Sequence, residues 1–125
     1  MIFDTDILIW VQRGNRKAAK LIDDVTERYL SIQSYMELLQ CARNKEEHRY
    51  IKNFLKKFSF ETLPVSQNIG HRAAIYIEEY SLSHGVRAGD AIIAATAVEN
   101  DLTLCTGNRK HFKCINELSL KIFKN

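Results

Sequence analysis

The sequence predicts an α/β fold, a three-layer sandwich with a mainly parallel central sheet, formed by a single domain over residues 1–125. Short strand-like runs alternate with segments in which apolar residues recur every three or four positions, and that alternation is typical of parallel βα units. The run from Ala91 to Val98 is uniformly small and apolar, which predicts a helix buried against a sheet. The length suits one domain with a real hydrophobic core.

The opening strand is interrupted by two carboxylates, Asp4 and Asp6, so we expect the strand to end there and a helix to begin. Asp6 is the predicted N-cap of that helix. A surface helix follows over residues 15–25, with Asn15 as its N-cap, and a short strand is predicted over residues 29–32.

The next helix is predicted to begin at a capping box, Ser34-x-x-Glu37, in which each side chain satisfies a free backbone N–H group. Apolar residues recur at helical spacing over residues 46–58, with Lys and Arg on the other side, which indicates a basic amphipathic helix. Residues 60–65 alternate in polarity and end around the single proline, as an outer strand would.

The second half is predicted to contain two helices followed by two strands. Ser66 is expected to cap a long helix that stops at Gly85, and Gly89 with Asp90 opens the buried apolar helix. Strands are predicted over residues 102–105 and 120–123, with a turn between them.

Composition sets some limits on function. The formal net charge of +3 suits a polyanionic partner without requiring one. No apolar run approaches the roughly 20 residues of a membrane span, and no signal-peptide pattern is present, so we expect a cytoplasmic protein that does not enter a membrane. The three cysteines form neither a disulfide framework nor a zinc motif, and we expect them to be small buried residues.

Three carboxylates, Asp4, Glu37 and Asp90, lie near the ends of predicted strands or at the starts of predicted helices. Taken singly, Asp4 suits an Asx turn, Glu37 a capping box and Asp90 a helix N-terminus. In a parallel sheet, however, strand carboxyl ends and the N-termini of helices share one edge, so the three acids should face one crevice. Carboxylates in such proximity require protons or a cation, and an all-oxygen site favours Mg²⁺ or Mn²⁺. Such a metal site is suited to phosphoryl transfer.

The pattern resembles the PIN-domain ribonucleases, and among them the VapC-type toxins of toxin-antitoxin pairs. The resemblance rests on four segments in order: residues 3–10 around Asp4, residues 34–39 around Glu37, residues 89–97 around Asp90, and residues 104–112, which contain Thr106-Gly107-Asn108. It implies a metal-dependent endoribonuclease in which Asp4, Glu37 and Asp90 hold Mg²⁺ or Mn²⁺ and Thr106 supplies a hydroxyl.

This chain departs from the family pattern at two positions. Asn108 stands where the family often has a fourth acid, and its amide oxygen remains able to coordinate a metal ion. Asp6 stands where the family commonly has Asn, which adds a negative charge near the implied site. The departures leave open whether one or two metal ions bind.

The resemblance also implies partners: an RNA substrate, a VapB-type antitoxin protein whose segment covers the acidic site, and a second copy of the chain in a homodimer. The helices over residues 34–58 are the candidate groove, where Tyr50, Phe54 and Phe58 form either an exposed apolar strip or part of the core. Arg87 and Arg109 are the first candidates to contact an RNA backbone.

Two alternatives remain at this point. Phe3-Asp4-Thr5-Asp6 also resembles the strand-end DxD of haloacid-dehalogenase-like phosphatases, in which the first Asp is a nucleophile and the second an acid/base, although no clear catalytic Lys follows at a suitable spacing. A degenerate PIN-like module that binds RNA or protein without turnover is the second, because the fourth acid is absent.

Overall fold

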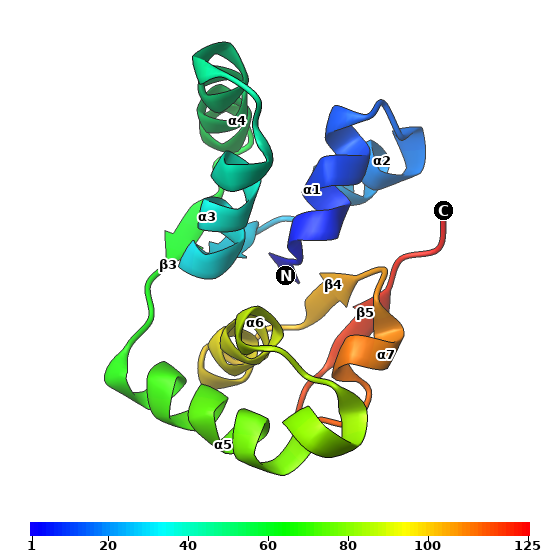
Figure 1. Ribbon diagram of the computed structural model, residues 1–125. Helices are drawn as coiled ribbons and strands as arrows, with labels where there is room; N and C mark the ends of the chain where they lie inside the picture. The colour runs from blue at the N-terminus through cyan, green and yellow to red at the C-terminus, as the bar shows by residue number, and fades with distance from the viewer.

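The computed structural model describes residues 1–125 and shows a central sheet with helices on both faces (Figure 1). All five strands are parallel and lie in the order β3-β2-β1-β4-β5. The three-layer α/β sandwich predicted from the sequence is therefore confirmed. The strands are β1 (Ile2–Phe3), β2 (Tyr29–Ser31), β3 (Glu61–Leu63), β4 (Leu104–Thr106) and β5 (Leu120–Ile122).

Seven helices form the outer layers. In Figure 1, α1 to α4 lie on one side of the sheet and α5 to α7 on the other. Strand β1 shows how the layers are built, because Ile2 packs in the core with α5 and α6 while Phe3 packs with α1 to α4. The helices are α1 (Thr5–Gln12), α2 (Arg16–Asp24), α3 (Ile32–Cys41), α4 (Lys45–Lys57), α5 (Gln67–His84), α6 (Ala88–Glu99) and α7 (Arg109–Phe112).

Several helix boundaries follow from local chemistry as predicted. The side chain of Asn15 accepts a hydrogen bond from the Ala18 N–H group and caps α2, and Ser66 caps α5 in the same way through Ile69. Gly85 ends α5 in the left-handed conformation, with φ of 68°, which glycine adopts without a steric cost. Helix α6 is buried along most of its length, as its composition predicted.

Two predicted caps are wrong. The N-cap of α1 is Asp4 rather than Asp6, because the helix begins directly after the strand and Asp4 Oδ1 accepts the Thr5 N–H at 2.7 Å. Helix α3 is capped by Ser31, whose hydroxyl accepts the Ser34 N–H at 3.0 Å, so Ser34 lies inside the helix and forms no capping box with Glu37. The helix starts two residues earlier than the local pattern indicated at α1, and three residues earlier at α3.

The aromatic strip of α4 belongs mainly to the core. Phe54 and Phe58 have ring centroids 4.8 Å apart and pack against the cluster that contains Phe3, whereas Tyr50 is 53% exposed. Cys41 is exposed, which corrects the prediction that all three cysteines are buried; its place at the end of α3 leaves it outside both cores. No helix combines the length and the apolar character needed to cross a membrane.

Candidate active site

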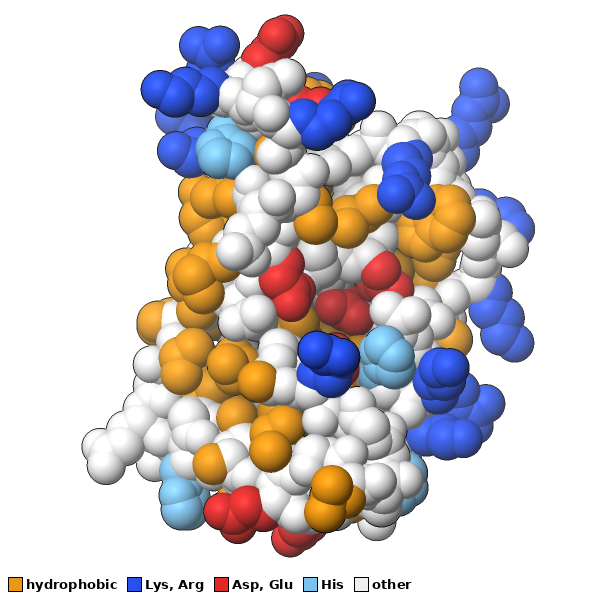
Figure 2. Space-filling model, viewed as in Figure 1, with side chains coloured by type: hydrophobic (Ala, Val, Ile, Leu, Met, Phe, Trp, Pro, Cys, Tyr) orange, Lys and Arg blue, Asp and Glu red, His pale blue; other side chains and the backbone are white.

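The carboxyl edge of the sheet brings together side chains from distant parts of the chain. Asp4 follows β1, Thr106 ends β4, Glu37 lies on α3 just after β2, and Asp90 lies in the first turn of α6. Figure 2 shows acidic side chains gathered in the middle of this face, with basic and histidine side chains next to them. The arrangement follows from parallel topology, because strand ends and helix N-termini meet at this edge.

Asp4 is the most deeply buried of these acids, at 6% exposure. Its Oδ1 accepts the Thr5 N–H, and its Oδ2 accepts the Thr106 hydroxyl, each at 2.7 Å. Burial, and then repulsion from Asp6, raises the pKa of Asp4 from 3.8 to about 7, while the hydrogen bond from Thr106 opposes the rise. A nearby cation would restore the ionised form of this carboxyl at neutral pH.

Glu37 is held by contacts on both of its oxygens. Thr5 donates from its hydroxyl to Oε1 at 2.5 Å, and Gln33, one turn earlier on α3, donates from its amide to Oε2 at 3.2 Å. Gly89 of α6 lies against this group, since a Cβ atom there would stand 3.0 Å from Glu37 Oε2 and 3.1 Å from Gln33 Nε2. The absence of a side chain at Gly89 therefore lets α6 approach the carboxylate closely.

Asp90 is part-buried and lies between charges of both signs. Burial raises the pKa of Asp90, the charges of His111 and Arg87 lower it, and the charge of Glu37 raises it. The His111 Nδ1 atom stands 3.8 Å from Asp90 Oδ2. Arg87 is exposed and is the N-cap residue of α6, but its side chain makes no capping bond. Its positive charge acts on Asp90 and lowers the pKa of that carboxyl.

Asp6 and Asn108, the two positions that depart from the family pattern, are in contact. Asp6 Oδ2 accepts the Asn108 side-chain N–H at 3.2 Å and the backbone N–H of Gly107 at 2.9 Å. The backbone N–H of Asn108 in turn donates to the Thr106 hydroxyl at 3.0 Å. The turn after β4 is thus bonded to both carboxylates at the start of α1.

These groups suit a hard divalent cation. Burial is the largest cause of a raised pKa at Asp4, Asp6 and Asp90, so the edge concentrates negative charge that solvent does not fully screen. All the donors are oxygen atoms, which favours Mg²⁺ or Mn²⁺. No three His, Cys, Asp or Glu side chains lie close enough together to ligate one ion jointly. Mg²⁺ commonly keeps several waters and takes only one or two carboxylates.

Residues 1–117 match the model of the PIN domain. The chain belongs to the PIN-domain family. Along 122 residues, the PIN domain described here is 32% identical to ribonuclease VapC10 of Mycobacterium tuberculosis, an alignment that covers 94% of this chain and 90% of the relative.

Solved structures agree with the fold. A toxin-antitoxin complex from Klebsiella pneumoniae superposes with a TM-score of 0.79 and 29% identity, covering 94% of this chain and 93% of the other. VapBC-1 from nontypeable Haemophilus influenzae gives a TM-score of 0.81 over 98% of both chains, at 22% identity. The second comparison speaks for the fold alone.

Sequence reasoning found most of the acidic edge but not its supports. Asp4, Glu37, Asp90 and Thr106 lie at this edge as expected, and Asn108 lies beside Asp6. The contacts of Thr5 and Gln33 with Glu37 were not predicted. Gln33 had a detectable signal, because it precedes Glu37 by four positions on one helix face. Thr5 had none, since it is 32 residues from Glu37.

Proposed function

We propose that this PIN domain is a metal-dependent endoribonuclease and the toxin of a toxin-antitoxin pair, and that Asp4, Glu37 and Asp90 hold Mg²⁺ or Mn²⁺. The observation that carries the proposal is that these three acids lie at one sheet edge, where Asp90 acts on the pKa of Asp4 and Glu37 on that of Asp90. One or two of them would bind a hydrated ion directly and the rest through its waters. The VapC10 relative, which is named a ribonuclease, supports the choice of RNA as substrate.

The chain's own residues have distinct parts in this proposal. Thr106 and the Thr5 N–H fix the two oxygens of Asp4, and Thr5 and Gln33 fix those of Glu37. A bound divalent ion would supply a water of lowered pKa and would neutralise charge on the phosphate oxygens. Arg87, whose charge acts on Asp90, and Arg109, which follows Asn108 at the start of α7, are exposed and would attract the RNA backbone.

The nuclease proposal is tested by incubating the purified protein with structured RNA, with Mn²⁺ and with EDTA. The Asp4→Asn and Asp90→Asn variants are assayed beside it, and Asp23→Asn, at an exposed position of α2, is the matched control. We expect cleavage by the parent and the control only, and only with metal. Cleavage in EDTA, or equal cleavage by all four proteins, would overturn the proposal.

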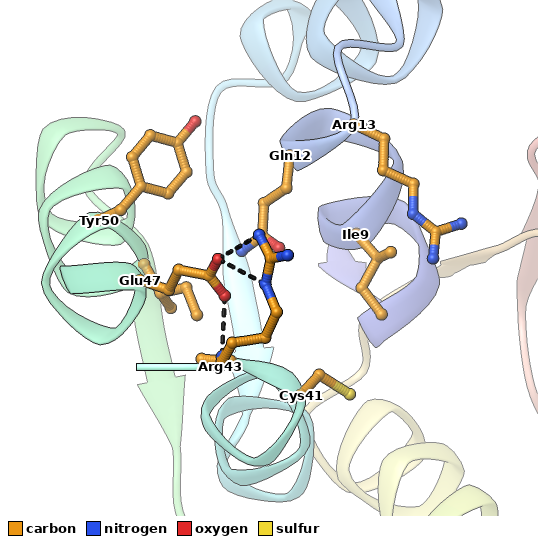
Figure 3. A pocket seen from close by; sticks show the side chains of 9 residues that line it. Ile9, Gln12, Arg13, Cys41, Arg43, Glu47 and Tyr50 are labelled. Carbon is orange, nitrogen blue, oxygen red and sulfur yellow. Dashed lines mark hydrogen bonds and ion pairs between the residues drawn. The ribbon is translucent and has the colours of Figure 1, made fainter. Parts of the chain in front are cut away.

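The antitoxin partner is assigned to a cleft between α1, α3 and α4 of about 510 Å³. Figure 3 shows Ile9 and Gln12 of α1 on one side and Tyr50 of α4 on the other, with Arg43 bonded to Glu47 between them. The cleft combines apolar walls with arginines, which suits a chain segment that carries both apolar and acidic side chains. Its lining residues are Ile9, Gln12, Arg13, Cys41, Ala42, Arg43, Glu47, Tyr50 and Ile51.

The cleft assignment is tested with a VapB-type antitoxin, sought as the product of a short reading frame next to this gene. Tyr50→Asp should weaken binding of that protein at least tenfold by calorimetry, because an aromatic anchor is replaced by a charge. Leu82→Asp, at a fully exposed position of α5, is the control and should bind like the parent. Equal affinities for the parent and Tyr50→Asp would exclude the cleft as the docking site.

The homodimer is proposed on the resemblance to VapC-type toxins. Sedimentation of the isolated protein across a concentration series tests it, and a single species of 14.5 kDa at all concentrations would contradict it.

A binding module without turnover is the second candidate, and Asn108 favours it because an amide takes the place of a fourth acid. Retention of RNA with no cleavage, in Mn²⁺ as in EDTA, is its expected result. The phosphatase alternative loses its support, because the PIN-domain match extends over residues 1–117.

A further inference from the structure

The side chain of Asp6 bonds a distant turn of the chain and does not cap the helix in which it lies. Asp6 lies in the first turn of α1, two residues after Asp4, and its side chain turns toward the segment that joins β4 to α7. One oxygen, Oδ2, accepts two hydrogen bonds from that segment, from the Gly107 N–H at 2.9 Å and from the Asn108 amide at 3.2 Å. Both hydrogen bonds that Asp6 Oδ2 accepts therefore come from the protein itself.

The other carboxylate oxygen of Asp6, Oδ1, has no such donor. Asp6 Oδ1 is buried and forms no hydrogen bond of good geometry, although the backbone N–H groups of Asp6 and Ile7 lie near the carboxylate and lower its pKa. A buried carboxylate oxygen without a donor is costly, and most such groups in folded proteins have a partner. The segment Thr106 to Asn108 binds Asp4 through the Thr106 hydroxyl and Asp6 through Gly107 and Asn108, so the two carboxylates border the same turn. A group shared with Asp4 is the natural partner of Oδ1.

The turn is built to accept a carboxylate at this place. A Cβ atom at residue 107 would lie 2.9 Å from Asp6 Oδ2, closer than real Cβ contacts, so glycine is needed for the approach. Asn108 offers an amide N–H, which an aspartate at the same position would not. The pair therefore consists of one acid that keeps a free oxygen and one amide that orients it.

We propose that Asp6 is an additional carboxylate of the metal site, reaching the bound ion or one of its waters through Oδ1, and that Gly107 and Asn108 position it. The inference rests on the proposed metal-dependent function. Asp6 contributes charge and an oxygen donor beside Asp4, Glu37 and Asp90, as a hard cation requires. Asn108 then acts on the metal through Asp6 rather than as a ligand of its own.

The experiment measures Mn²⁺ binding by calorimetry on the full chain, together with thermal unfolding of the metal-free protein. Asp6→Asn keeps the size of the side chain and an oxygen that accepts the Gly107 N–H, but removes the charge. We expect Mn²⁺ affinity to fall about tenfold to a hundredfold, with no loss of thermal stability in EDTA. Asp23→Asn, on the exposed face of α2, should leave both quantities unchanged.

A purely structural role for Asp6 predicts the opposite result. If Asp6 only clamps the turn, Asp6→Asn changes the unfolding temperature or nothing at all, and Mn²⁺ affinity equals that of the parent. Either result would overturn the inference. The double variant Asp6→Asn with Asn108→Asp exchanges acid and amide while keeping them in contact, and it should regain part of the lost affinity. A double variant no better than Asp6→Asn would overturn the pairing with Asn108.

The outcome for Asp4→Asn separates this inference from the proposed function. If the parent binds Mn²⁺ and Asp4→Asn abolishes binding while Asp6→Asn does not change it, only the role of Asp6 fails. If the parent binds no Mn²⁺, both the metal-dependent function and the role of Asp6 fail.

Discussion

Thr106 and Asp4 are 102 residues apart in the chain and meet through a hydrogen bond of 2.7 Å from the threonine hydroxyl to Oδ2 of the carboxyl. The bond joins the ends of two neighbouring parallel strands, β4 and β1. The same hydroxyl accepts the Asn108 N–H at 3.0 Å. One side chain therefore fixes both the deepest acid of the site and the turn that follows β4.

Replacing Thr106 by Val should cost about 1–3 kcal/mol in the free energy of unfolding, because the hydroxyl is lost while Asp4 and the Asn108 N–H keep their polar groups. The hydrogen bond from Thr106 lowers the pKa of Asp4, so its loss should raise that pKa further and move the acid limb of RNA cleavage to higher pH. Thr106→Ser retains the hydroxyl and should keep the parent's pH profile. If Thr106→Val and Thr106→Ser had the same pH profile of RNA cleavage, the hydroxyl would not control the pKa of Asp4.

Asp4 also predicts how stability depends on pH without metal. Its pKa is about 7 in the folded protein, against an ordinary value of 3.8. Between about pH 4 and pH 7 the unfolded chain releases this proton and the folded chain retains it. The free energy of unfolding should therefore fall as pH rises through this range, by up to about 4 kcal/mol from this group. Below the range the contribution is fully present.

Urea unfolding in EDTA from pH 4.5 to 8 measures this effect, and Asp4→Asn is the reference because it cannot titrate. The difference in stability between the parent and Asp4→Asn should become less favourable to the parent as pH rises. Mn²⁺ at pH 7.5 should then stabilise the parent more than the variant, since the ion binds only the folded site. A difference that is constant with pH would show that Asp4 ionises normally.

Gly89→Ala should damage the site without damaging the fold. The added methyl group meets the ends of two flexible side chains, Glu37 and Gln33, so these move rather than the backbone. Stability should stay level or rise by up to about 1 kcal/mol, because Ala favours a helix more than Gly does. RNA cleavage should fall about tenfold or more, because Glu37 is displaced.

Gly70→Ala in α5 is the matched control for Gly89→Ala. Its nearest neighbour would be Val65 Cγ1 at 4.0 Å, an ordinary contact, so the same change in helix propensity occurs away from the acids. Activity should stay at the parent level in this variant. Equal losses of activity in both variants would place the effect in the helices and not at Glu37.

Arg87→Gln should weaken RNA binding by about the same factor for all sequences and reduce the salt dependence by about one phosphate contact. Arg87 is exposed, makes no capping bond and acts on the charge of Asp90, so the loss concerns RNA and not helix α6. Filter binding in EDTA at several salt concentrations measures the slope. Arg16→Gln, exposed on α2, should keep it. If the salt dependence of RNA binding were unchanged in Arg87→Gln, Arg87 would not contact the RNA backbone.

The sequence carried enough information for the layers and the edge, since alternating periods and polar residues at strand ends are local patterns. The errors arose where the tertiary structure decides between neighbouring candidates. Strand β1 ends at Phe3, so the first free N–H groups of α1 face Asp4, and Asp6 is left to bond the distant turn at Gly107. At α3, Ser31 both ends the strand and caps the helix.

The residues that hydrogen-bond the acids could not be predicted from the sequence, because tertiary structure decides these contacts too. Thr5 and Glu37 are 32 residues apart, and Asp6 and Asn108 are 102 apart, so no local spacing relates them. Only pairing of β1 with β2 on one side and β4 on the other sets these distances.

That central position of β1 has a consequence for synthesis. Its partner β4 begins only at Leu104, and the turn that binds Asp4 and Asp6 follows β4. A growing chain thus carries its first acids for about a hundred residues of synthesis without the segment that orders them. The acidic edge can assemble only after β4 and the turn that follows it have been made.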